Sequence, residues 1–215
     1  MEKRQRVVIF AAGQLYAEYL KTLKKNDIVI GVDRATLWLI KHGLMPNYGI
    51  GDFDSVTSTE LKEIKLKVKN LLEYPREKDA TDLELALDFV LKINPQDVLI
   101  YGAIGDRLDQ SIGSVFLLEK LLKHGIKAEI ADRNNSLRLI KERTSVERKY
   151  KFKYLSVLPF SSTAVVSVSG CRYNLLRKKL NRRASLGISN EIVGKTAEVA
   201  VHQGLVLLIQ SRDLS

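Results

Sequence analysis

The pattern of apolar residues changes once along the chain, near Asn134, and this change constrains the fold more than any other feature. Before it, short β-rich runs such as VVIF and DVLIYG alternate with stretches of helical periodicity, which is typical of a parallel sheet covered by helices. After it, short apolar runs are separated only by turns, which predicts a small antiparallel sandwich or barrel. We therefore predict an α/β domain over residues 1–134 and an antiparallel β domain over residues 135–215.

The expected strands and helices follow from these runs. In the first domain we expect strands at VVIF, DIVIGV, YGIG, LLEY, DVLIYG and AEIAD, and helices near residues 15–23, 35–41, 60–67, 83–91 and 111–122. In the second domain we expect strands at SLRLI, TSVERK, YLSVLP, TAVVSVSG, AEVAVH and LVLLIQS. Thr57 with Glu60, and Thr81 with Glu84, have the spacing of capping boxes. These four residues therefore have a structural explanation before a catalytic one.

Cysteine content and hydropathy indicate a cytoplasmic protein. The single cysteine, Cys171, excludes an intramolecular disulfide and argues against a cysteine-based zinc site. The apolar run after the basic N-terminus is too short for a signal peptide, and no stretch reaches the roughly 20 apolar residues of a membrane span. We therefore expect a soluble protein in the reducing cytoplasm, with no membrane contact.

The net charge predicts attraction of anions. The chain carries 35 Lys and Arg against 25 Asp and Glu, a formal charge of +10, and such a field attracts nucleotides and nucleic acid alike. Much of the excess lies between residues 141 and 183, at Arg148, Lys149, Lys151, Lys153, Arg177, Lys178, Lys179, Arg182 and Arg183. A solvated basic face is the simplest interpretation, and contact with phosphate or nucleic acid is the alternative.

Acidic side chains directly follow two of the expected strands. Asp33 comes after DIVIGV, where it could equally cap the next helix. Asp52 and Asp54 follow YGIG two residues apart, and in extended chain such side chains point the same way. Adjacent carboxylates repel each other unless a proton or a metal intervenes, and Mg²⁺ prefers one or two carboxylates with phosphate oxygens and water. In the alternative, Asp54 or Ser55 caps the following helix in a solvated turn.

Two further motifs lie at the starts of expected helices. In YPREKDATDLELAL, Asp79 and Asp82 flank a threonine; the helix dipole favours acids there, although capping does not need both. In YGAIGDRLDQSIGS, Gly105 lets backbone amides approach a phosphate, and Arg107 offers a planar fork for its oxygens. This motif lacks the GKS or GKT ending of a P-loop and the full spacing of a dinucleotide fingerprint.

All four motifs are expected at one rim of the sheet, because open α/β sheets bind ligands outside the carboxyl ends of their strands. Together they supply carboxylates for a metal and an arginine for phosphates. No serine or cysteine nucleophile is paired with a histidine, and the three histidines lack the spacing of metal ligands. This combination suits phosphoryl-type transfer, in which a protein positions the reactants and neutralises charge.

In their order and wording, these motifs resemble those of thiamin pyrophosphokinases. The resemblance rests on GVDRATLWLIKHGLMPNYGIGDFDSV, EKDATDLELAL, GAIGDRLDQ and, near the C-terminus, GISNE, and it covers most of the chain. It implies transfer of diphosphate from Mg-ATP to thiamin with release of AMP. It also implies a Rossmann-like ATP-binding catalytic domain over residues 1–134, a thiamin-binding β-sandwich over residues 135–215, and a homodimer with thiamin between the subunits.

The resemblance further implies roles for individual residues. Mg²⁺ is expected at Asp52, Asp54 and Asp82. The nucleotide is expected at Asp33, Arg34, Lys78, Gly105, Arg107 and Asp109, and thiamin at Ser189 and Asn190. The expected catalytic residues are Asp79, Asp82 and Arg107, with Asp79 the better candidate for accepting the proton of the thiamin hydroxyl.

Two positions depart from the family pattern. Gln110 stands where many bacterial members have histidine, and Asp106 stands where glycine is common. An acid at Asp106 is unfavourable beside bound phosphates unless it points away or meets a metal. This departure weakens the prediction of a tight phosphate cradle at Gly105.

Two other functions stay open on the sequence alone. The basic second half carries aromatic residues such as Tyr150 and Phe160, a combination that could stack on nucleic acid but equally fits alternate faces of sandwich strands. An enzyme of the same class could instead use another heteroaromatic alcohol, such as a pterin precursor. The GISNE segment favours thiamin by resemblance, so we expect thiamin and ATP as partners and no nucleic acid.

Overall fold

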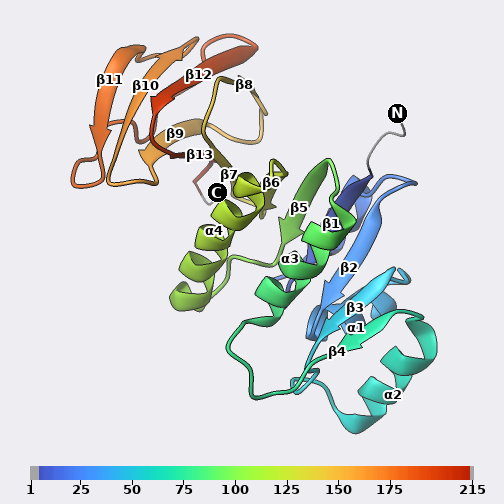
Figure 1. Cartoon of the computed structure of the whole chain (residues 1–215). Helices are drawn as coiled ribbons and strands as arrows, with labels where there is room; N and C mark the ends of the chain where they lie inside the picture. The colour runs from blue at the N-terminus through green and yellow to red at the C-terminus, as the bar shows by residue number, and fades with distance from the viewer. Residues whose placement is uncertain (1–4, 214–215) are drawn as a thin grey trace. The chain divides into compact units, whose positions relative to one another are not determined.

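The computed structural model describes residues 5–213, which divide into two compact units with the boundary between Ala131 and Asp132. Unit 1 (residues 1–131) contains six strands that pair in parallel in the order β4-β3-β2-β1-β5-β6 (Figure 1). Their bounds are β1 (Arg6–Phe10), β2 (Ile28–Val32), β3 (Tyr48–Gly51), β4 (Leu71–Glu73), β5 (Asp97–Tyr101) and β6 (Lys127–Ala131).

Helices cover both faces of this sheet, as the alternating pattern predicted. They are α1 (Arg34–Lys41), α2 (Ser58–Lys67), α3 (Asp82–Ile93) and α4 (Leu108–Lys123). The helices α3 and α4 pack against each other on one face, and α1 packs on β2 from the other (Figure 1). Because both faces are covered, Val7, Val8, Ile9 and Phe10 of the central strand are all fully buried, which explains the continuous apolar run VVIF. None of the helices described is long and apolar enough to cross a membrane.

The strand order creates a natural binding position. The chain runs outward from β1 through β2 and β3 to β4, and then returns to place β5 on the other side of β1. The direction in which the chain adds strands therefore reverses between β1 and β5, which places a topological switch point at the carboxyl ends of these two strands. Open α/β sheets bind their ligands at such switch points.

Two local expectations in unit 1 need correction. The segment near residues 15–23 is a short 3-10 helix, η1 (Ala17–Thr22), because Tyr19 stacks on Tyr101 with ring centroids 4.2 Å apart and this packing holds a tight turn. The capping box at α2 is complete, but at α3 only half of the expected box forms. The Glu84 amide bonds the Thr81 hydroxyl, whereas the Glu84 carboxylate pairs with Lys120.

Unit 2 (residues 132–215) consists of two antiparallel sheets. One has the order β7-β13-β9, and the other has the order β11-β10-β12-β8. The bounds are β7 (Asn135–Ile140), β8 (Thr144–Glu147), β9 (Tyr154–Pro159), β10 (Thr163–Ser169), β11 (Leu175–Asn181), β12 (Thr196–Gln203) and β13 (Val206–Ser211). Val157 and Leu208 of the first sheet share one buried core with Val166 and Val199 of the second. This arrangement is a β-sandwich, so the predicted fold class is confirmed.

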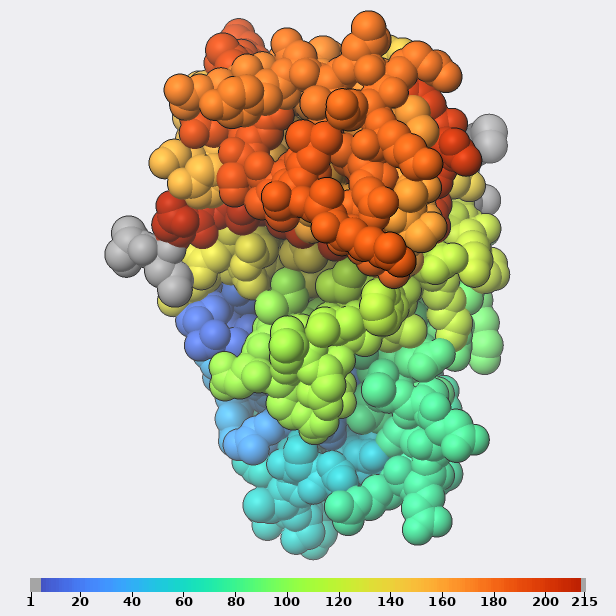
Figure 2. Space-filling view, turned by 90° about the vertical axis from the view of Figure 1, so that its left-hand side faces the viewer, coloured from blue at the N-terminus to red at the C-terminus, as the bar shows by residue number. Residues whose placement is uncertain are grey.

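Strand β11 was not among the expected strands. It lies at the edge of its sheet, and around residues 175–190 the chain covers much of the visible face of unit 2 (orange in Figure 2). Its sequence, LLRKKLN, is mostly exposed, and the register shifts near Arg177, which has φ of 43°. Charged side chains and bulges are common on edge strands because they discourage pairing with other chains. The basic run therefore has a structural role in the sandwich.

Candidate active site

A cavity of about 490 Å³ lies at the carboxyl ends of the strands of unit 1. Its floor is formed where the loops after β1 and β5 are joined by the hydrogen bond from Gly13 N to Gly102 O, 3.0 Å long. A Cβ atom at Gly13 would lie 2.3 Å from that oxygen, so only glycine permits this approach. The other lining residues include Asp33, Arg76, Lys78, Thr81, Asp82, Gly105, Asp106, Arg107, Gln110, Ser111 and Ser114.

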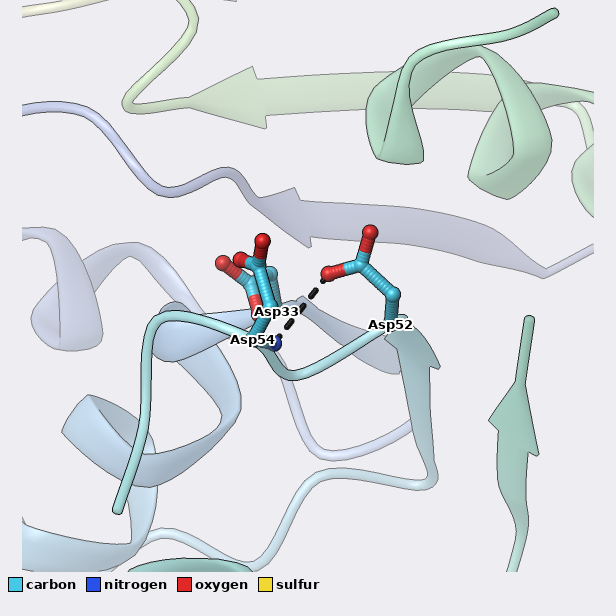
Figure 3. A group of neighbouring side chains, drawn as sticks. All are labelled: Asp33, Asp52 and Asp54. Carbon is cyan, nitrogen blue, oxygen red and sulfur yellow. Dashed lines mark hydrogen bonds between the residues drawn. The ribbon is translucent and has the colours of Figure 1, made fainter. Parts of the chain in front are cut away.

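Three carboxylates gather beside this cavity. Asp33 follows β2, and Asp52 and Asp54 follow β3, and one oxygen of each lies within 4.8 Å of the others. Figure 3 shows the three side chains on the same side of the loop, with the Asp54 amide donating to Asp52 Oδ1 at 3.2 Å. Carboxylates at this separation repel each other unless a cation lies among them.

The backbone around these acids is strained. Residues 52–54 are not extended as expected, because Phe53 has φ of 54° and turns the chain between the two carboxylates. Asp33 has φ of 49° and stands at the start of α1, but its side chain makes no capping bond. Instead Asp33 Oδ2 accepts a hydrogen bond from Ser55 Oγ at 2.6 Å. Positive φ at non-glycine residues costs free energy and is concentrated at functional sites.

Lys78 links the acids to Asp82, the first residue of α3. The Lys78 ammonium donates a hydrogen bond to Asp52 Oδ2 and lies 3.1 Å from Asp82 Oδ1, a buried oxygen that accepts no hydrogen bond from residues 5–213. Burial raises the pKa of Asp82, and the neighbouring charge of Asp52 adds to this rise, more than Lys78 offsets. Burial would also raise the pKa of Asp52, but the bonds from Lys78 and from the Asp54 amide outweigh it and lower that pKa.

The donor set fits a small divalent cation such as Mg²⁺. Asp33 Oδ1 is buried and has no hydrogen-bond partner among the described residues, a costly arrangement unless a ligand completes it. Asp33, Asp52 and Asp54 offer the hard oxygen ligands that Mg²⁺ prefers. Asp82 lies one ammonium group away from Asp52, so a cation in the place of the Lys78 ammonium would contact both.

The loop before α4 contributes Arg107 to the cavity lining, and Asp109 in the first turn of α4 lies beside it. Arg107 and Asp109 are both exposed and pair with each other at 2.5 Å. The hydrogen bond from Arg107 lowers the pKa of Asp109. The Gly105 amide, expected to face phosphate, donates to Ser111 Oγ at 3.1 Å. Ser111 also bonds the Arg107 carbonyl, so one buried hydroxyl holds the shape of this loop.

Five of the residues expected at the metal, nucleotide and catalytic positions are not in the cavity lining. Three of them, Asp52, Asp54 and Asp109, each pair with a residue that is in it. Asp79 is exposed in the loop before α3, and Arg34 is exposed in the first turn of α1. Sequence reasoning missed the bond of Ser55 to Asp33 and the bonds of Ser111 to the loop. The spacing of Ser111 six residues after Gly105 was available as a signal, but nothing in the sequence distinguished it from an ordinary helix residue.

Unit 2 has its own pocket, of about 540 Å³, which no charged residue lines. Its lining is Tyr173, Leu175, Ala184, Ser185, Leu186, Gly187, Ile188 and Asn190. The Asn190 side chain is buried, accepts hydrogen bonds from the Tyr173 and Glu191 amides, and donates to the Tyr173 carbonyl. Ser189 is not in the lining, has φ of 57°, and bonds Ser156 Oγ through its amide. Asn190 therefore shapes the wall that carries the exposed Tyr173 ring.

Comparisons with known proteins agree with this division of the chain. The catalytic domain model of thiamin pyrophosphokinase matches residues 19–130, and the vitamin B1 binding domain model of the same family matches residues 143–206. A thiamine pyrophosphokinase of Bacillus subtilis (strain 168) is 33% identical over 191 residues, which cover 88% of this chain and 89% of that protein.

Solved structures give the same result. The crystal structure of thiamine pyrophosphokinase from Bacillus subtilis superimposes with a TM-score of 0.91 at 31% identity, covering 98% of this chain and 100% of that one. The thiamin pyrophosphokinase structure from Geobacillus thermodenitrificans gives a TM-score of 0.87 at 30% identity, covering 98% and 99%. The resemblance inferred from the motifs is confirmed, and this chain belongs to the thiamin pyrophosphokinase family of enzymes.

Proposed function

We propose that this chain transfers diphosphate from Mg-ATP to the primary hydroxyl of thiamin, giving thiamin diphosphate and AMP. The observation that carries the proposal is the group of Asp33, Asp52 and Asp54 beside the cavity of unit 1. Diphosphoryl transfer needs positioning and charge neutralisation, and the described residues of this cavity offer carboxylates and cations for both.

Asp52, Asp54 and Asp82 are the proposed Mg²⁺ ligands, with Asp33 beside them. A bound Mg²⁺ supplies neutralisation of the phosphate charge and fixes the phosphates in position. With Mg²⁺ held by these acids, the Lys78 ammonium, which pairs with Asp52 and Asp82 in this structure, would be available to contact phosphate oxygens. The unpartnered Oδ1 of Asp33 supports this assignment, because a ligand is needed to complete it.

The nucleotide is proposed to lie along the cavity, with its phosphates near Lys78 and within reach of the Arg107 guanidinium, and with the Gly105 loop contacting the rest of the nucleotide. Arg107 is well suited because, among the described residues, its exposed guanidinium pairs with Asp109 alone, and this exposed pair can open at little cost. Asp109 then orients the fork of Arg107 toward phosphate oxygens. Arg34 is proposed to act from the rim, since it is exposed beside Asp33.

In the transfer step, the thiamin oxygen forms a bond to the β-phosphorus, and the bond from that phosphorus to the α,β-bridging oxygen breaks. AMP leaves with the electron pair of this bond, and the hydroxyl proton passes to a carboxylate. Asp79 is the proposed acceptor because it is exposed near Lys78 and carries no other interaction within residues 5–213. Asp82 is the alternative, since burial raises its pKa.

The uncharged pocket of unit 2 is the proposed site of thiamin, with Ser189 and Asn190 beside it. Thiamin is an aromatic cation, and an apolar pocket with an exposed tyrosine ring offers stacking and a cation–π contact. The absence of a lining Lys or Arg also supports this ligand, because a cation would be repelled by either. The cytoplasmic location stays a prediction.

The proposed assembly is a homodimer that completes the thiamin site. Leu108, Ile112 and Phe116 are 70%, 45% and 60% exposed at four-residue spacing on α4, a helix on the visible face in Figure 2. Leu186 and Ile188 are similarly exposed at the pocket of unit 2. Clustered exposed apolar side chains mark interaction surfaces, so we propose that a second copy covers them. Light scattering should then give twice the chain mass of 24.3 kDa.

The decisive experiment incubates the purified protein with ATP, Mg²⁺ and thiamin and identifies the products. We expect thiamin diphosphate and AMP in equal amounts, with loss of turnover on chelation and recovery when Mg²⁺ is restored. Formation of ADP would indicate ordinary kinase chemistry, and turnover of a pterin alcohol in preference to thiamin would change the acceptor. Salt-sensitive nucleic-acid binding without turnover would contradict the proposal as a whole.

A further inference from the structure

Asp106 is a cavity residue that the proposed chemistry leaves without a role. Its exposed carboxylate lines the wall formed by the loop between β5 and α4, and within residues 5–213 it has no ion pair or hydrogen bond. An acid just before a helix is favoured by the helix dipole. The dipole explains the sign of the charge, but it does not explain why the carboxylate stands in the wall of a nucleotide cavity.

The backbone beside Asp106 does not form the phosphate cradle that was expected at Gly105. The Gly105 amide donates to Ser111 Oγ and is therefore occupied. A carboxylate repels phosphate oxygens, so a phosphate directly at Asp106 would be disfavoured. The Asp106 side chain itself offers a ligand a hydrogen-bond acceptor, which suits hydroxyl groups.

The strand order indicates which part of a nucleotide reaches Asp106. The acids follow β2 and β3, while Asp106 follows β5, which is separated from β2 by β1 alone. Neighbouring strands are about 4.8 Å apart, so the loop with Asp106 begins roughly 10 Å along the rim from Asp33. The cavity runs from Asp33 and Asp82 past the Gly13 loop to Asp106. With the β- and γ-phosphates at the acids, the α-phosphate and then the sugar follow toward Asp106.

We propose that Asp106 accepts hydrogen bonds from the 2′- and 3′-hydroxyls of the nucleotide ribose and makes the site selective for ribonucleotides. The two oxygens of a carboxylate match the two hydroxyls of a cis-diol, and an acidic side chain contacts a ribose in this way in dinucleotide-binding folds. The inference rests on the proposed use of ATP. It also resolves the conflict between an acid and a phosphate site, because the acid faces the sugar.

The test measures binding of Mg²⁺-ATP and Mg²⁺-2′-deoxy-ATP by calorimetry, without thiamin. We expect the wild-type protein to bind the deoxynucleotide about tenfold more weakly, as is typical for loss of one hydrogen bond to a charged group. In Asp106→Gly this ratio should fall to about one, and in Asp106→Asn, which keeps one acceptor oxygen, it should be intermediate. Melting curves of both variants establish that they are folded.

A matched control removes an acid from α4, the helix that follows Asp106. Glu119 lies on α4, pairs with Lys123 at 3.0 Å, and is not in the cavity lining. Glu119→Gln should therefore keep the tenfold ratio. If the ratio of the two affinities falls to about one in Glu119→Gln as well, the selectivity arises from the charge around α4 and not from Asp106, and the proposal is wrong.

Three other outcomes would overturn the inference. The ratio could stay tenfold in Asp106→Gly. Both nucleotides could bind more tightly with an unchanged ratio, which would make Asp106 only a repulsive neighbour of the phosphates. The variant could change the Mg²⁺ dependence alone, which would make Asp106 a metal ligand. An active wild-type enzyme with any of these results leaves the proposed function intact, whereas a wild-type protein that binds no ATP contradicts both.

Discussion

Unit 1 contains 19 Lys and Arg and 19 Asp and Glu, whereas unit 2 contains 16 and six, so unit 2 holds the whole net charge of +10. The charges of the proposed ligands do not follow the net charges of the units, because the anion ATP is assigned to unit 1 and the cation thiamin to the basic unit 2. Each site departs from the charge of its unit: acids gather at the first, and no charged residue lines the second. The net charge of a unit therefore characterises its surface as a whole, while the position of individual charged residues determines which ligand each site can bind.

The two units also differ in how they treat buried polar groups. In unit 1, Asp33 has a strained backbone and an oxygen without a hydrogen-bond partner among the described residues. In unit 2, the Asn190 side chain makes three hydrogen bonds to the backbone around it. Asp33 therefore needs a ligand to complete its hydrogen bonding, whereas Asn190 makes its hydrogen bonds within the protein. Substitutions at the site of unit 1 should thus affect activity, and substitutions at Asn190 should affect stability.

The largest expected effect follows from Asp52→Asn. The variant loses a charged metal ligand, so we expect AMP release to fall by about a hundredfold or more, while thiamin binding by unit 2 persists. The assay is AMP formation, with thiamin affinity by calorimetry as the second measurement.

Glu73→Gln is the matched control for this variant. Glu73 ends β4 on the same edge of the sheet and is paired with Lys65, and it is not in the cavity lining. The control should retain turnover. Near-normal AMP release by Asp52→Asn would contradict the assignment of Asp52 as a metal ligand. It would also contradict the expectation that substitutions at the site of unit 1 affect activity.

The next effect is expected in unit 2. Asn190→Ala leaves the Tyr173 amide and carbonyl without their partner in a partly buried setting, which should lower the free energy of unfolding by about 1–3 kcal/mol. Ser189→Ala removes a hydroxyl for which the structure gives no such bond, and should change it little. Circular dichroism measures the loss. An Asn190→Ala protein with unchanged stability and weakened thiamin binding would show that Asn190 serves the ligand directly.

A smaller effect of opposite sign is expected at Asp33. Asp33→Gly relieves a positive φ and removes a buried oxygen without a partner, so the free energy of unfolding should rise by about 1 kcal/mol. Turnover should fall, because the acid group loses a member. The chain has a single tryptophan, Trp38 on α1, whose fluorescence follows unfolding of unit 1. A variant that is both less stable and fully active would contradict the interpretation of Asp33 as a ligand-completed group.

Much of this organisation could be predicted because it follows from local pattern. Buried parallel strands require continuous apolar runs, and the acids that end β2 and β3 reach the same rim by the rules of such sheets. The position of Asp33 beside Asp52 and Asp54 follows from that topology. The completed box of Thr57 and Glu60 was also predictable, because its spacing is fixed by helix geometry.

Other features could not be predicted because they depend on distant partners or on edges. Strand β11 lacks alternation, since its bulge at Arg177 and its exposed edge relax the demand for apolar residues. The capping box expected at α3 is incomplete because the Glu84 carboxylate accepts a hydrogen bond from Lys120, 36 residues away. The turn at Phe53, which brings two carboxylates together without an extended chain, has no signature in its neighbours.

The smallest effect separates a structural acid of unit 1 from its site acids. Glu60 caps α2 and pairs with Lys41, and the bond from Lys41 together with the Thr57 amide lowers the pKa of Glu60 from its ordinary 4.5 to about 2. Because the folded pKa is the lower one, its stabilisation is present above pH 4.5 and is lost as the pH falls toward 2. Glu60→Gln should therefore lower the melting temperature of unit 1 at neutral pH by only a small amount, on the order of 1 °C, since the pair is exposed. The difference from the wild type, followed by Trp38 fluorescence at pH 7, 5, 4 and 3, should shrink with acid while AMP release at pH 7 stays normal. A difference that grows toward pH 3, or a loss of turnover, would place Glu60 with the acids of the site and erase the distinction between capping and catalytic carboxylates within unit 1.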